Sequence, residues 1–183
     1  MSRYSRFIPA LALLVAALGW PATAPSQDNW DTMRERFDGV WRLAVPAATA
    51  RRTVHGAVDR AVDAMNYFLR AVARPMVREN TPVNEEIELR FRDGNNLYAR
   101  FDQRANYTSP LNGTRRVNTP DGDPMRVTQR FRGNDLEQVF QAENGTRWNV
   151  FTILPDGRMR MSATTSAEMM PEPLRFSLTY RRR

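Results

Sequence analysis

The chain has 183 residues, no cysteine, one histidine and 27 basic residues, all of them arginine, against 20 acidic residues, which gives a formal charge of +7. The lack of cysteine excludes disulfides, a thiolate nucleophile and a lipidated cysteine. A single histidine and the lack of a Gly-x-Ser-x-Gly motif remove the usual nucleophile and base pairs, so we expect no enzymatic activity, no cofactor and no bound metal.

The first 26 residues have the pattern of a secretory signal peptide. Arg3 and Arg6 precede the apolar run FIPALALLVAALGW, and the small residues of PATAPS follow it. The run is shorter than the roughly 20 apolar residues that a membrane-spanning helix needs. We therefore expect export to the periplasm or secretion after cleavage near Ala24 or Ser26, with an uncleaved anchor as the alternative. Residues 27–183 are then enough for a single domain.

Residues 47–75 form a predicted helical insert. Their apolar residues recur at spacings of three and four, as one stripe of an amphipathic helix: Val54, Val58, Ala61, Met65, Leu69 and Val72. Pro75 is expected to stop or kink this helix. On the polar side, His55, Asp59 and Asp63 lie four apart, but nothing elsewhere completes a metal-ligand set, so we favour a polar stripe over a metal site.

From Glu86 onward the period changes from helical to alternating, with apolar residues on one face and charged residues on the other. Short turn signals separate the segments: PLNG, PDGDP, GND, ENG and PDG. Strands joined this closely pair with their neighbours in an antiparallel meander. We predict a mainly β fold, an up-and-down barrel of about 8 to 10 strands, because closure removes two exposed edges. The first strand, Val40 to Val45, would pair with the last.

The inner face of this barrel is the candidate ligand site. Its predicted lining is Leu89, Phe91, Phe101, Val127, Phe131, Phe140, Val150, Met159, Met161, Phe176, Leu178 and Tyr180. Two interpretations remain open, because a barrel of about eight strands is wide enough either to be filled by side chains or to hold one small ligand. In the first case the protein is a solid interaction module, and in the second it carries a hydrophobic small molecule or lipid.

The outer face carries charges at positions suited to cross-strand ion pairs. They are Glu86, Glu88, Arg100, Arg126, Arg130, Glu137, Arg158 and Arg160. We favour a solvated outer wall, in which each exposed pair contributes about 1 kcal/mol or less. The alternative is a docking surface for an anionic membrane, since arginine makes forked hydrogen bonds to anions. We expect a monomer and no nucleic-acid partner, because no basic stripe is interleaved with aromatic residues.

The stretch FDGVWRL resembles the opening strand of the calycins, the superfamily of lipocalins and intracellular fatty-acid-binding proteins. The resemblance implies that Gly39 and Trp41 form the barrel floor, with Arg181 or Arg175 of the last strand as the basic partner of the indole. A helical segment after the first strand is similar to the layout of fatty-acid-binding proteins and implies a non-enzymatic carrier of a fatty-acid-like ligand. The export that residues 1–26 predict departs from that intracellular family. Leu178 departs from the Arg-x-Tyr motif by which the last strand of those proteins binds a carboxylate.

Overall fold

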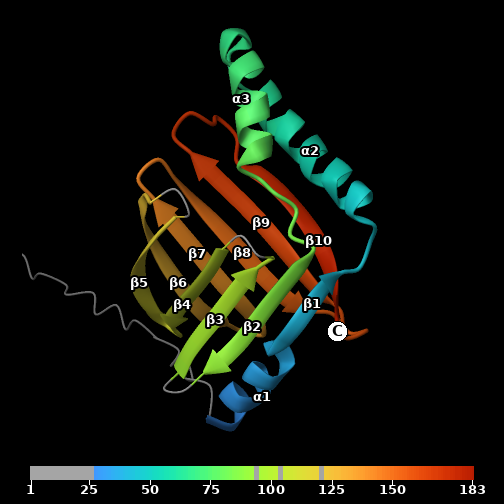
Figure 1. The fold of residues 1–183 in the computed structure, drawn as a ribbon, viewed down its shortest axis with the longest axis vertical. Coiled ribbons are helices and arrows are strands. Elements are labelled where there is room, and N and C mark those ends of the chain that lie inside the picture. Colours follow the sequence, from blue (N-terminus) through green and yellow to red (C-terminus); the bar gives the residue numbers. More distant parts are fainter. Residues whose placement is uncertain (1–26, 93–94, 103–104, 120–121) are drawn as a thin grey trace, which may run out of the picture.

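The computed structural model describes residues 27–183 apart from 93–94, 103–104 and 120–121 (Figure 1). The predicted signal peptide therefore lies outside the described residues. No helix in the described part of the chain is long and apolar enough to cross a membrane.

The helices are α1 (Gln27–Phe37), α2 (Ala47–Asp63) and α3 (Tyr67–Glu79). The strands are β1 (Gly39–Leu43), β2 (Glu86–Arg92), β3 (Asn96–Phe101), β4 (Ala105–Pro110), β5 (Gly113–Asn118), β6 (Pro124–Arg132), β7 (Asp135–Ala142), β8 (Gly145–Ile153), β9 (Met159–Ala167) and β10 (Leu174–Arg182).

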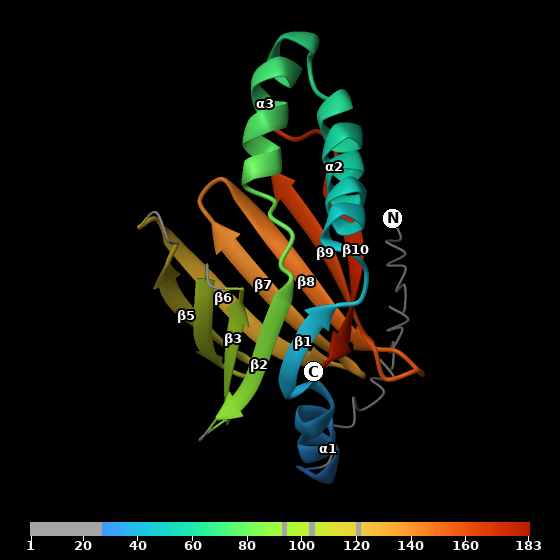
Figure 2. The ribbon, with the colours of Figure 1, turned by 45° about the vertical axis from the view of Figure 1, so that its right-hand side comes forward.

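The ten strands form one antiparallel sheet that curls into a nearly closed barrel (Figures 1 and 2). Their order is β4-β3-β2-β1-β10-β9-β8-β7-β6-β5. Neighbouring strands in the sheet are therefore also neighbours in the sequence, except where β1 pairs with β10. Leu43 of β1 is opposite Tyr180 of β10 in this junction. The predicted meander, its strand number and the pairing of the first strand with the last are confirmed.

The two ends of the sheet, β4 and β5, meet at a seam. The Leu111 N–H donates to the carbonyl of Asn95 (2.8 Å), and the Asn112 N–H donates to the carbonyl of Gln129 in β6 (2.7 Å). These bonds lie in the turn between β4 and β5, and a short bridge of Leu111 to Gln129 joins the turn to β6. Two backbone N–H groups of the turn thus have hydrogen-bond partners at the place where an open sheet would leave its edges unpaired.

The helical insert is a hairpin of α2 and α3 rather than the single amphipathic helix, stopped or kinked at Pro75, that the periodicity predicts. The chain breaks between Asp63 and Tyr67, where the Asn66 side chain caps α3 by accepting a hydrogen bond from the Phe68 N–H (3.1 Å). An asparagine cap satisfies one of the free N–H groups at a helix start, which makes this break favourable. Pro75 lies inside α3. The hairpin extends beyond one end of the barrel, and α1 lies at the other end (Figure 1).

The barrel floor is built around Trp41, which is buried and donates its indole N–H to the carbonyl of Phe37 at the end of α1 (2.9 Å). Gly39 has a φ of 145°, a conformation that favours glycine. The basic partner of the indole is Arg182, whose Cζ lies 4.9 Å from the ring centroid. The expectation of Arg181 or Arg175 is wrong, because successive residues of a strand point to opposite faces and both of these lie exposed on the outer wall.

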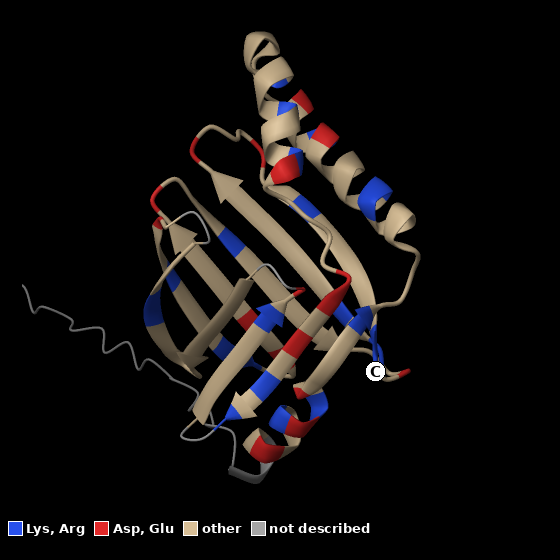
Figure 3. Cartoon of the chain, viewed as in Figure 1, with Lys and Arg blue, Asp and Glu red and all other residues tan. Residues whose placement is uncertain are grey.

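The outer wall carries part of the expected cross-strand ion pairs, among them those of Glu86, Glu88, Arg100, Arg130 and Glu137, and Figure 3 shows acidic and basic residues on the neighbouring strands β2 and β3. Arg158 pairs instead with Asp156 of the preceding turn. Arg100 of β3 contacts Glu88 (2.9 Å) and Glu86 (3.2 Å) of β2, and Arg130 of β6 contacts Glu137 of β7 (2.7 Å). These contacts link neighbouring strands on the face that points away from the core. Their role here is to hold the register of the wall.

Candidate ligand site inside the barrel

Most of the predicted lining residues share the inner face and join one apolar core. These are Leu89, Phe91, Phe101, Val127, Phe131, Phe140, Met159, Met161, Phe176, Leu178 and Tyr180. The core continues into buried residues of α2, which packs against β10. The alternation read from the sequence therefore places eleven of the twelve residues on the correct side of the wall.

Val150 is the exception and lies on the outer face. It is opposite Glu137 of β7 and Ser162 of β9, whose hydroxyl contacts the exposed Ser177 hydroxyl (2.9 Å). Cross-strand partners share a face, so the inner residues of β8 are Arg147, Asn149 and Phe151. The alternation predicted for this strand is wrong by one residue. As a result, the sequence analysis does not identify Arg147 and Asn149 as inner residues.

Four buried side chains form a hydrogen-bonded row across the inner wall. The Asn149 amide donates to Gln138 (3.3 Å), and the Gln138 amide donates to Gln129 (2.7 Å). The Gln129 amide in turn donates to the Ser109 hydroxyl (2.8 Å) and to the carbonyl of Leu97 (3.0 Å). Each buried amide thus has a partner, as low-dielectric surroundings require. The row also ties β6 to β4 and β3 across the seam. We name Asn149, Gln138 and Gln129 the amide row.

Arg147 begins this row from the side of the β7–β8 turn. Its Nε donates to the Asn149 side-chain oxygen (3.1 Å), and its Cζ lies 5.8 Å from the centroid of the Phe176 ring. Burial lowers the pKa of the guanidinium, while Tyr180 and Tyr107 raise it. Arginine nevertheless stays charged at neutral pH. Among the described residues no carboxylate forms an ion pair with Arg147, so the barrel interior holds a cation without an anion.

The tyrosines near Arg147 are neutral phenols. Burial raises the pKa of both Tyr107 and Tyr180, so neither supplies a negative charge at neutral pH. The Tyr180 hydroxyl donates to the carbonyl of Asn84, in the segment between α3 and β2 (3.0 Å). This bond fixes the connection from the helical hairpin to the barrel.

A group of aromatic rings lies on the same inner face as the guanidinium. The Tyr107 and Phe140 centroids are 5.0 Å apart, and each lies 6.4 Å from the centroid of Phe101. Phe140 is directly opposite Arg147 in the β7–β8 pair. We name Phe101, Tyr107, Phe140, Arg147 and Phe176 the aromatic chamber. It combines apolar surface with one positive charge, which is the arrangement that an amphipathic anion requires.

Two hollows lie on the outside of the barrel beside the helices. The larger, about 680 Å³, lies between α2, the end of α3 and the segment before β2, and its lining includes His55, Arg51 and Glu85. The other, about 350 Å³, adjoins the end of β1. Both have charged linings, so neither offers the apolar surface that the aromatic chamber provides.

The polar stripe of α2 faces α3. Asp59 pairs with Arg78 (2.7 Å), and Asp63 pairs with Arg74 (2.6 Å). No cluster of three or more metal-ligating side chains occurs in the described part of the chain. The carboxylates of this stripe therefore hold the two helices together.

Comparison with known proteins defines the fold. No protein-family model and no curated protein sequence matches the chain. Among solved structures, a secretory abundant heat soluble protein of Ramazzottius varieornatus has 9% identity and a TM-score of 0.55, covering 81% of this chain and 96% of its own. Apo lipid binding protein 8 of Caenorhabditis elegans has 10% identity and a TM-score of 0.52, with the same coverage. The protein thus has the fold of the calycin-like β-barrels, with a helical hairpin after the first strand.

Proposed function

We propose that this protein is an exported, non-enzymatic carrier that binds a small amphipathic anion in the aromatic chamber. The observation that supports the proposal is Arg147, a charged side chain on the inner face with no carboxylate partner among the described residues. Arg147 is half-buried, and a bound carboxylate would pair with its guanidinium through charge-assisted hydrogen bonds. The name of the similar Caenorhabditis elegans structure, lipid binding protein 8, is in keeping with such a ligand. Export rests on the sequence pattern of residues 1–26.

The aromatic chamber is suited to the apolar part of the same ligand. Phe101, Phe140 and Phe176 present rings to the interior close to the guanidinium, so one molecule can contact apolar carbon and the cation together. Each methylene group that leaves water on binding contributes about 0.8 kcal/mol. The charged group then determines orientation, and the apolar part supplies most of the affinity.

A matched pair of ligands tests the proposal. Decanoate and decanol have the same tail, so isothermal titration of both isolates the contribution of the carboxylate. Wild type should bind decanoate at least tenfold more tightly than decanol, and Arg147→Met should lose that preference. Arg160→Met, which removes an exposed arginine of the outer wall, is the matched control and should behave as wild type. Equal binding of the two ligands to wild type, or an unchanged preference in Arg147→Met, would contradict the proposal.

A second candidate function, favoured by the outward face of α3, is docking to an anionic lipid surface. Phe68, Val72 and Met76 lie four residues apart on one side of the helix, and Phe68 and Val72 are 84% and 70% exposed. The arginines on the other side pair with α2, so the helix turns its apolar side to solvent. The upper part of this hairpin projects clear of the barrel (Figure 2). Exposed apolar helix faces of this kind bind at membrane interfaces.

Vesicle co-sedimentation tests the docking surface. Wild type should sediment with vesicles containing phosphatidylglycerol, and Phe68→Ser combined with Val72→Ser should reduce the bound fraction at least fivefold. Trp148→Ser is the control, because Trp148 is an exposed aromatic residue of the barrel wall rather than of α3. Binding that survives the double substitution would place the contact elsewhere on the molecule.

A further inference from the structure

The inner face of the barrel has two zones that differ in how much surface stays accessible. Phe101, Phe140 and Phe176 in the aromatic chamber keep between 6% and 9% of their surface. Leu136 and Phe151, further along the same inner face, keep none. A side chain with no accessible surface borders no space that could hold a water molecule. The rings of the first zone therefore keep surface that a ligand can contact, and the side chains of the second zone are fully covered.

The amide row separates these two zones. Arg147 is opposite Phe140, Asn149 is opposite Gln138, and Phe151 is opposite Leu136, so the three pairs follow one another along β8 and β7. Each step of two residues advances about 7 Å along a strand. A group held by the Arg147 guanidinium thus lies about 7 Å along β8 from the amide row. It lies about 14 Å from Phe151 and Leu136, which we call the packed zone. The amide row is itself buried and hydrogen-bonded throughout, so its side chains offer no free surface or polar group to a ligand.

Arg147 also lies close to an end of the barrel. Ala142 and Gly145 flank the β7–β8 turn as a directly opposed pair, and Arg147 follows Gly145 by two residues. The tail of an acid that pairs with Arg147 therefore has two courses. It lies across the aromatic rings, or it leaves the barrel past this turn.

From this division we infer that the site suits compact aromatic monocarboxylates and gains no affinity from the longer tail of a fatty acid. The inference rests on the proposed function and concerns the same site. A long tail finds no room below the amide row, so the carbons beyond the chamber stay in water and add no affinity. The aromatic chamber, by contrast, offers ring edges and faces to a ligand, as the edge-to-face contact of Tyr107 with Phe140 illustrates. Planar rings gain from such contacts beyond the area that they bury.

The test is a series of acids titrated into the wild-type protein at constant pH and ionic strength. The straight-chain members are butanoate, hexanoate, octanoate, decanoate, dodecanoate and hexadecanoate, each below its micelle concentration. The dissociation constant should fall about fourfold per methylene for the short acids and then stay constant beyond about decanoate. A constant that continues to fall through hexadecanoate would overturn the inference and leave the proposed function intact. Failure of every acid in the series to bind would overturn the proposed function instead.

A pair of cyclic acids tests the aromatic preference. 3-Phenylpropanoate and 3-cyclohexylpropanoate have the same number of carbons, and the aromatic acid should bind between about two- and tenfold more tightly. Equal binding, or tighter binding of the saturated ring, would overturn this part of the inference.

Two substitutions locate the ring within the barrel. Phe140→Leu changes the aromatic chamber, whereas Phe151→Leu makes the same change in the packed zone. The first should weaken 3-phenylpropanoate severalfold and the second should leave the dissociation constant unchanged. The reverse pattern would show that the ligand enters the packed zone and would overturn the inference. Because the acid series needs only wild type, the test stands even where one of these variants fails to fold.

Discussion

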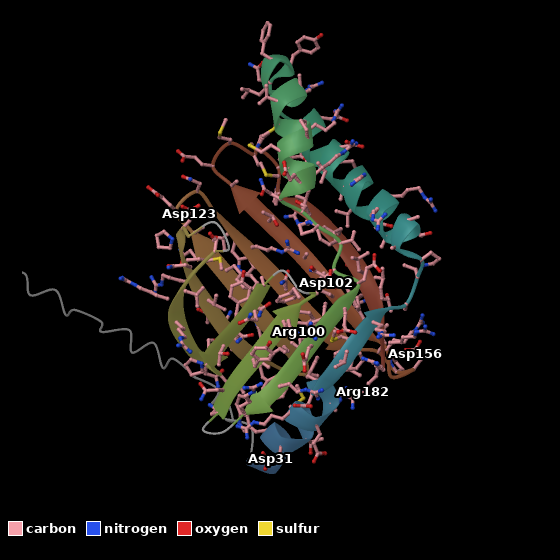
Figure 4. All side chains as sticks on the ribbon, viewed as in Figure 1. Asp31, Arg100, Asp102, Asp123, Asp156 and Arg182 are labelled. Atoms are coloured by element: carbon pink, nitrogen blue, oxygen red, sulfur yellow. The ribbon has the colours of Figure 1, made fainter. Side chains whose placement is uncertain are left out.

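Arg182 lies over the indole ring of Trp41, with its Cζ 4.9 Å from the ring centroid, and joins three elements of the barrel floor. The same guanidinium donates to the carbonyls of Glu35 (3.1 Å) and Arg36 (2.6 Å) near the end of α1. A cation at this position also interacts favourably with the helix dipole. One side chain of β10 thus connects β1 and α1, where the strand and helix termini meet (Figure 4).

Substitution of the indole should destabilise the fold strongly. Trp41→Ala is expected to lower the free energy of unfolding by about 3 to 5 kcal/mol, because it deletes a large buried aromatic side chain and leaves a cavity. Urea denaturation measures the change. Trp148→Ala, at an exposed position of the outer wall, should cost less than about 1 kcal/mol. A loss below about 1 kcal/mol for Trp41→Ala would contradict the assignment of this residue to the floor.

Arg182 and Arg181 should differ although they are neighbours in sequence. Arg182→Met removes a cation–π contact and two hydrogen bonds to helix carbonyls, so we expect it to lower the free energy of unfolding by about 1 to 2 kcal/mol. Arg181→Met changes an outward residue and should alter it by less than about 0.5 kcal/mol. Equal effects in urea denaturation would show that the cation over Trp41 has no stabilising role.

The difference between these two arginines illustrates what the sequence could predict. The Gly-x-Trp stretch identifies the strand and the residue that closes the floor, and the alternation of later segments identifies the meander. Neither fixes a register to within one residue, because neighbouring residues point to opposite faces. The partner of Trp41 was therefore predicted one position too early, at Arg181 instead of Arg182.

The same uncertainty concealed Arg147. The segment GTRWNVFTI has apolar residues in both phases, so its alternation alone favours Trp148 and Val150 as inner residues. The two-residue turn before it holds a better signal, since such a turn sets Ala142 opposite Gly145. Counting back along β7 then places Phe151 opposite Leu136 and Arg147 opposite Phe140. The break after Asp63 had a local signal too, because asparagine at position 66 is a preferred helix cap.

The amide row should stabilise the seam of the barrel. Gln129→Leu leaves the Ser109 hydroxyl, the Leu97 carbonyl and the Gln138 amide without their partner, and unsatisfied buried groups cost about 1 to 3 kcal/mol each. We expect a total loss of at least about 3 kcal/mol, together with faster amide hydrogen exchange in β4. A variant with unchanged exchange in β4 would show that the backbone contacts of the turn hold the seam by themselves.

Glu88 should make a pH-dependent contribution to stability. Its hydrogen bond to Arg100 holds the pKa of the Glu88 carboxyl below its ordinary value of 4.5, although partial burial acts in the opposite direction. A lowered pKa in the folded state gives stability that is present above the unfolded pKa and is lost as pH falls through the folded value.

The matching measurement compares wild type with Glu88→Gln by urea denaturation between pH 7 and pH 3. Wild type should be more stable by up to about 1 kcal/mol at pH 7, and the difference should shrink below about pH 4.5. Glu143→Gln, in the exposed β7–β8 turn, is the control for general charge effects. A difference that grows as the pH falls would contradict the role assigned to the ion pair.

The most direct test of Arg147 as the anion site is carbon-13 NMR of decanoate labelled at its carboxyl carbon and bound to the protein. An adjacent cation favours the ionised form of a carboxylate and so lowers its pKa. In wild type, the bound signal should keep the chemical shift of the ionised acid as the pH falls through the range in which free decanoate takes up its proton. In Arg147→Met, any bound signal should titrate in the ordinary range. A wild-type signal that titrates like that of free decanoate, or one that Arg147→Met leaves unchanged, would contradict an anion site at Arg147.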